Sequence, residues 1–159
     1  MKMSNNMKKN IFFTSLSALF CLWLLTACGL VELHSSKNGD LDGFWHLETV
    51  DSLATGNTCD LREERRFWMF QVTIFQLYCP ELMEGQRFVG QFSHENGTLT
   101  LWKVLYDIRE EGDPVVESVD IIRPFGINQI ENVVFHVDEL SGSKMTLSNE
   151  MLRLSFKKH

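Results

Sequence analysis

The sequence predicts an all-β protein, an antiparallel meander of about eight strands that closes into a barrel. Three observations lead to this prediction. Apolar and polar residues alternate along most of the chain after residue 42, which is the period of half-buried strands. Turn signals such as Asn96-Gly97 separate the alternating segments, and no long segment has a helical period. Closure is expected because a barrel has no exposed strand edge that invites aggregation.

Residues 1–27 are expected to be a lipoprotein signal peptide that is cut off before Cys28. The first ten residues are positively charged, because they contain Lys2, Lys8 and Lys9 and no acidic residue. An apolar run follows over 11–25. That run is short for a permanent helix across a hydrocarbon core of ~30 Å. It ends in Leu25-Thr26-Ala27-Cys28, which resembles the lipobox of bacterial lipoproteins.

Cys28 is therefore the predicted site of lipid attachment, because its thiolate is the nucleophile that receives the lipid. Two or three acyl chains anchor a protein more firmly than one. Gly29 follows the cysteine, which by analogy with other lipoproteins favours the outer membrane and leaves the leaflet open, periplasmic face or cell surface. Residues 28–42 are predicted to be the lipidated cysteine and a flexible tether, and 43–159 the barrel domain.

Without its leader the chain has 132 residues, enough for one domain. It carries 12 lysines and arginines against 21 acidic residues, a net charge of −9. Nucleic acid is excluded as a partner, because phosphate binding needs clustered cations. The one basic cluster, Arg62, Arg65 and Arg66, alternates with glutamates and is expected to be a self-paired, solvated helix face.

The first strand is expected over 43–50, with Trp45 and Leu47 on one face. A helical turn over 61–66 follows from the capping-box spacing of Asp60 and Glu63. The segment 67–77 reads as one long strand with Trp68, Phe70, Val72 and Ile74 sharing a face. The later predicted elements are strands over 87–92 and 98–103 around the Asn-Gly turn, a further strand within 104–113, and three strands over 132–137, around 145–147 and over 152–156.

Cys59 and Cys79 remain in the mature chain, and an oxidising compartment permits a disulfide between them. A single strand over 67–77 would span roughly 35 Å and hold the two apart, whereas a disulfide needs Cα atoms within about 7 Å. A disulfide and two buried thiols both stay open.

Three features of the chain are similar to those of a known family of β-barrels. They are Gly43-Phe44-Trp45 at the start of the first strand, the meander order, and Phe156-Lys157-Lys158 at the end of the last strand. Over residues 41–158 the chain resembles the lipocalin-like, or calycin, β-barrels, and especially the small lipocalin-like lipoproteins of Gram-negative anaerobes. The resemblance implies that Trp45 plugs the closed end of the barrel beneath a C-terminal arginine. Arg153 is the available arginine, although its alternation places it outside, and the T-D-Y motif of lipocalins is missing.

The resemblance implies that the barrel binds a small apolar or amphipathic ligand. Trp45, Trp68, Phe70 and Phe92 are then the candidate lining residues, and core packing is the competing interpretation. The alternative function is an interaction module with a filled barrel, which contacts an envelope protein or glycan through the loops 51–66 and 107–128. Trp102 falls on the polar side of its strand and is expected at the surface.

Catalytic and metal-binding patterns are missing from the sequence. The five histidines have no metal-site spacing, and no nucleophile or phosphate-loop motif is present. The paired carboxylates Glu63-Glu64 and Glu110-Glu111 lie in expected loops, where a hydrolase would need them desolvated. We therefore expect no enzyme, no metal and no cofactor.

Overall fold

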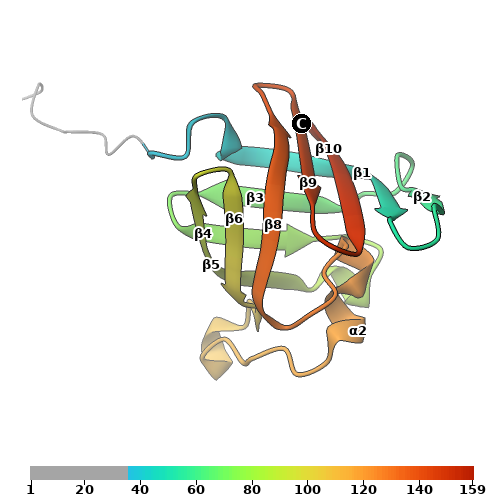
Figure 1. Cartoon of the computed structure of the whole chain (residues 1–159). Helices are drawn as coiled ribbons and strands as arrows, with labels where there is room; N and C mark the ends of the chain where they lie inside the picture. Colours follow the sequence, from blue (N-terminus) through green and yellow to red (C-terminus); the bar gives the residue numbers. More distant parts are fainter. Residues whose placement is uncertain (1–35) are drawn as a thin grey trace, which may run out of the picture. The chain divides into compact units, whose positions relative to one another are not determined.

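The computed structural model describes residues 36–159, which form a closed antiparallel barrel (Figure 1). Eight strands in the order β10-β9-β8-β6-β5-β4-β3-β1 make the wall, and β10 pairs with β1 to close it. They are β1 Gly43–Ser52, β3 Phe67–Gln71, β4 Ile74–Tyr78, β5 Arg87–Glu95, β6 Thr98–Lys103, β8 Glu131–Leu140, β9 Lys144–Ser148 and β10 Leu152–Lys158. The predicted fold class is confirmed.

Short elements complete the barrel. Strand β2 (Thr58–Asp60) pairs with β1, and β7 (Leu105–Tyr106) pairs with β5. The remaining elements are the helix α2 (Val119–Ile122) and the 3₁₀ turns η2 (Gly39–Leu41), η3 (Met83–Gly85), η4 (Arg109–Glu111) and η5 (Arg123–Phe125). Over residues 36–159, no helix has the length and apolar character needed to span a bilayer.

Strict alternation builds the core, because every second residue of a strand points into the barrel. Phe88 and Phe92 on β5, and Leu154 and Phe156 on β10, are at most 3% exposed. The Asn96-Gly97 turn between β5 and β6 forms as predicted. Both of its residues have positive φ, 50° and 74°, as the tight turns favoured in hairpins require.

The long strand predicted over 67–77 is wrong, because the chain reverses at Val72-Thr73 and makes the hairpin β3–β4. Val72 has φ of 58° and is 53% exposed. A β-branched residue rarely occupies this left-handed region, and apolar residues at a turn extend the alternation on both sides. The turn was therefore hidden in the sequence pattern.

Two other predictions are corrected. Residues 61–66 form a turn rather than a helix: Asp60 Oδ1 accepts a hydrogen bond from the Arg62 amide at 3.1 Å, and no regular helix follows. The three arginines are paired with carboxylates, but with Asp60, Glu81 and Glu64 rather than along one helix face. The strand expected within 104–113 has only two residues, β7, before the chain turns through η4.

Replacing Val72 by asparagine is expected to stabilise the barrel by about 1 kcal/mol and to raise Tm by about 4 °C. Asparagine tolerates positive φ, and the exposed valine side chain gives up little burial. The backbone carbonyl of Val72, which accepts a hydrogen bond from Asn38 Nδ2 at 2.7 Å, is unchanged. Thermal unfolding followed by circular dichroism measures the shift.

The matched control is Leu53→Asn, an exposed apolar residue without positive φ, which should leave Tm unchanged or slightly lower. Equal shifts in the two variants would show that the turn conformation does not cost the expected free energy.

Candidate functional site

The four candidate ligand-lining aromatics all lie in the barrel interior, where they fill space against one another. Trp45 and Trp68 are fully buried, and Phe70 and Phe92 are 2% exposed. The rings of Phe70 and Phe92 meet edge to face with centroids 5.0 Å apart, and Trp68 lies 6.0 Å from Phe70. These are ordinary packing distances for aromatic pairs. The four residues therefore belong to one continuous core cluster.

Trp45 contacts the segment that precedes β1 and the end of β10. Its Nε1 donates to the Leu41 carbonyl at 2.8 Å, and the Lys158 ammonium lies 4.8 Å from the centre of its ring. Lys158 Nζ also donates to the Asp40 carbonyl at 2.8 Å. The cation that covers this tryptophan is thus Lys158, whereas Arg153 lies outside the barrel and faces Asp138 at 3.7 Å.

The segment 107–128 was expected as a long exposed loop, and instead it contributes to the core. It lies along the lower edge of the barrel in Figure 1, with α2 and η5 inside it. Val116, Ile122 and Phe125 are at most 1% exposed, and the Phe125 carbonyl accepts a hydrogen bond from Trp68 Nε1 at 3.2 Å. This segment closes part of the interior that an open lipocalin-like barrel would offer to a ligand.

Of the cysteines, Cys28 lies outside the described residues, and Cys59 and Cys79 are free thiols. The disulfide considered from the sequence is not formed, and the pair of buried thiols is not found either, because Cys59 is exposed. Cys79 is buried, and burial raises the pKa of its thiol. Its Sγ donates to Glu81 Oε2 at 3.4 Å, and a raised pKa leaves less of the nucleophilic thiolate.

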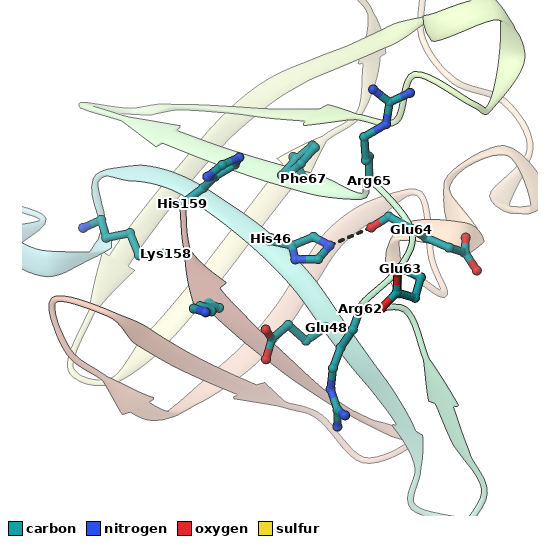
Figure 2. A pocket seen from close by; sticks show the side chains of 10 residues that line it. His46, Glu48, Arg62, Glu63, Glu64, Arg65, Phe67, Lys158 and His159 are labelled. Carbon is teal, nitrogen blue, oxygen red and sulfur yellow. Dashed lines mark hydrogen bonds between the residues drawn. The ribbon is translucent and has the colours of Figure 1, made fainter.

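A pocket of about 410 Å³ lies on the outer wall of the barrel, and we call it the Phe67 pocket (Figure 2). Strand β1, the 62–65 turn, the first residue of β3 and the end of the chain meet there. Its lining residues are His46, Glu48, Arg62, Glu63, Glu64, Arg65, Phe67, Lys157, Lys158 and His159. Apart from the arginine–glutamate turn, the sequence offered little sign that these residues would meet.

Aromatic rings make one wall of the Phe67 pocket. The ring of Phe67 stacks on Phe44 with centroids 4.5 Å apart, and His46 and His159 lie 5.3 and 5.6 Å from it. His46 is fixed by a 2.6 Å hydrogen bond between its Nε2 and the Glu64 carbonyl, drawn in Figure 2. Phe67 is 9% exposed, so part of its ring is open to the pocket. A flat apolar group could lie against this wall.

Charges of both signs surround the aromatic wall. Lys157, Glu48 and Glu63 have no ion-pair partner among residues 36–159, whereas Arg62 and Arg65 are paired with Asp60 and Glu81. The pocket therefore combines an apolar surface with free positive and negative groups. The sequence did contain one relevant sign, since Phe67 lies on the opposite parity to Trp68 and an aromatic at that position must face outwards.

Comparisons with known proteins agree with this architecture. The solved structure of a lipocalin-like protein from Bacteroides uniformis matches with 25% sequence identity and a TM-score of 0.57, covering 76% of this chain and all of that one. An uncharacterized protein from Bacteroides eggerthii has the same fold, with 21% identity, a TM-score of 0.57 and coverage of 75% and 99%. No curated protein matches the chain.

A family model described as a lipocalin-like domain matches residues 23–159. This match extends over most of the chain and includes every strand of the barrel. The chain belongs to the lipocalin-like domain family.

Proposed function

We propose that this chain is a non-enzymatic lipoprotein of the cell envelope that binds a small amphipathic molecule in the Phe67 pocket. The observation that carries the proposal is the filled interior, in which Trp45, Trp68, Phe70 and Phe92 are at most 2% exposed. An apolar ligand would have to displace these side chains. Open space of comparable size occurs in several places on the outside of the barrel, and the Phe67 pocket, of about 410 Å³, is the one with an aromatic wall.

The chemistry of the Phe67 pocket suits a molecule with a flat apolar part and a charged group. The apolar part would lie against Phe67, His46 and His159, where burial supplies the affinity. The charged group would meet Lys157 or Glu63 at the rim, which fixes its orientation. This division between apolar burial and a few polar contacts is typical of small-molecule sites.

The non-enzymatic part of the proposal draws on the exposure of the ionisable groups among the described residues. General acid–base catalysis uses desolvated groups, and no histidine or carboxylate between 36 and 159 is buried as a whole residue. A single carboxylate oxygen, Asp113 Oδ1, is shielded from solvent without a hydrogen-bond partner. The same residues contain no cluster of three or more His, Cys, Asp and Glu that could hold a metal ion.

Attachment to the membrane through Cys28 is supported by the lipobox-like sequence that precedes it. Among the described residues the first strand begins at Gly43, which agrees with the start of the barrel domain expected from the sequence. Cys28→Ser should release the protein from the membrane fraction while leaving the Phe67 pocket intact.

Native mass spectrometry of the protein extracted from cells in mild detergent tests the ligand. We expect a discrete extra mass that organic extraction removes. Because the charged group of the ligand meets the rim, Lys157→Glu or Glu63→Lys should lose this mass. Lys103→Glu, an exposed charge reversal on β6 outside the Phe67 pocket, is the matched control and should keep it.

Two outcomes would contradict the proposal. An extra mass retained by both rim variants would place the ligand elsewhere, with the barrel interior as the first alternative. A clean apo mass that persists after addition of a total lipid extract would favour the interaction module, which contacts an envelope protein. The segment 107–128 is a weak candidate for that contact, because Val116, Ile122 and Phe125 are committed to the core.

A further inference from the structure

The outer face of β5, β6 and β8 carries an exposed tryptophan at its centre. Trp102 on β6 is 44% exposed, as expected from its place on the polar side of the strand. Phe92 and Leu101 form the last pair between β5 and β6, and one residue beyond that pair come Gln91 and Trp102. On the other side, Asn132 of β8 lies opposite Trp102, between the β6–β8 pairs Leu101–Val133 and Lys103–Glu131.

Strands β5, β6 and β8 are neighbours in the wall of the barrel (Figure 1). Two rows of outward-facing residues cross these strands. One row runs through Ile74, Gln91, Trp102 and Asn132, and the next through Ser93, Thr100 and Val134. We call these seven residues the Trp102 face. Ile74 and Val134 are 41% and 48% exposed, so both rows present apolar surface beside the indole.

The polar members of the Trp102 face have unused hydrogen-bonding capacity. The side chains of Gln91, Ser93, Thr100 and Asn132 make no hydrogen bond to any residue between 36 and 159. Amides and hydroxyls both donate and accept, so they offer several free groups around the ring of Trp102. None of the seven residues is charged, and the first ionisable groups on this side of the wall are Glu95 and His136 in the next row, beside Thr98.

The lack of charge and the free polar groups of the Trp102 face limit which kinds of molecule could bind there. An anionic lipid surface needs lysines or arginines, and the Trp102 face has none. A charged protein partner would leave its charges without counterparts. A neutral sugar fits both features, because the C–H face of a pyranose ring is apolar and its hydroxyls are donors and acceptors.

We infer that the Trp102 face is a binding surface for a neutral glycan. The pyranose ring stacks on the indole of Trp102, and its hydroxyls bond to Gln91, Asn132 and the hydroxyls of Ser93 and Thr100. This surface is separate from the Phe67 pocket, with which it shares no residue, and it stands whether or not that pocket binds a ligand.

Affinity electrophoresis of the mature protein in gels containing dextran, starch, mannan or xylan tests the inference. We expect retardation by at least one of these neutral polysaccharides, and a loss of about tenfold or more in affinity in Trp102→Ala. Leu53→Ala, an exposed apolar residue away from the Trp102 face, is the matched control and should bind as the parent does. Trp102→Phe should keep part of the affinity, since a smaller ring still stacks.

Tryptophan fluorescence gives a second readout. Trp45 and Trp68 are buried, so acrylamide quenching in the mature chain reports mainly on Trp102, and the retarding polysaccharide should protect it. Migration unaffected by all four polysaccharides, or equal retardation of Trp102→Ala, would overturn the inference. So would sedimentation showing a dimer that Trp102→Ala dissociates, because a second copy of the chain would then occupy this face.

Discussion

Replacing Gly90 by alanine is expected to destabilise the barrel by about 3 kcal/mol and to lower Tm by about 10 °C. A Cβ at this position would lie 2.0 Å from the backbone oxygen of Lys103 and 2.5 Å from the ring of Phe75. Gly90 points inwards on β5, between Phe88 and Phe92. At this point the chain leaves β6 and turns inwards through Val104, which is fully buried.

The obstacle at Gly90 is a backbone atom, so no side-chain rotation can relieve it. Either the crossing from β6 to β7 or the β4–β5 pair Phe75–Gly90 must move. Gly142→Ala is the control, because a Cβ there meets nothing within 4 Å and the residue has no positive φ. Thermal unfolding that lowered Tm equally in the two variants would show that close approach at Gly90 is not the cause.

The strands that the sequence predicted well are those whose two faces differ clearly. On β10, Leu154 and Phe156 are buried while Arg153 and Lys157 are exposed, and a slip of one residue would reverse this arrangement. The turn Asn96-Gly97 was equally predictable, because few residues accept positive φ at both positions. These elements carry their own signal and need no tertiary information.

The hairpin β3–β4 lacked that signal, and an incorrect inference about the cysteines followed from it. Val72-Thr73 is a turn without glycine, asparagine or proline, and its conformation is imposed by the pairs on both sides. Because the chain reverses there, Tyr78 returns beside Phe67. The separation assumed between Cys59 and Cys79 therefore does not apply, although both thiols are free.

The partner of Trp45 could have been found from the sequence. Lys158 continues the parity of Leu154 and Phe156, which face the core, whereas Arg153 has the opposite parity. A cation at the end of the inward-facing row must lie at the mouth of the barrel, where its stem covers apolar surface and its ammonium meets the indole. Arg153 lies outside the barrel, as its alternation predicted, and the cation over Trp45 is Lys158.

Whether inward-facing aromatics line a cavity or fill it could not be decided from alternation. Trp68 and Phe92 would face inwards in either case, and the two cases differ in what else enters the barrel. That contribution comes from 107–128, a segment without periodicity, whose buried residues include Ile122 and Phe125. Its packing depends on the completed wall and has no local pattern that a sequence reading could detect.

Truncating Trp68 to alanine is the change that separates a filled barrel from an open one. We expect a loss of about 3–5 kcal/mol of stability, because a filled interior cannot collapse around the space left by an indole. Trp68 is fully buried, contacts Phe135 and Phe156 edge to face at 6.0 and 5.3 Å, and donates a hydrogen bond to the Phe125 carbonyl. The variant therefore also removes the hydrogen bond between the wall of the barrel and the segment 107–128.

Urea unfolding followed by circular dichroism measures this loss, with Trp102→Ala as the control. Trp102 is 44% exposed, so removing its ring should change the free energy of unfolding by less than about 0.5 kcal/mol. If Trp68→Ala were as stable as Trp102→Ala, the interior would already contain space around the indole. An internal ligand would then become the better account of this barrel, because a tryptophan that lines a cavity can be removed without opening a new one.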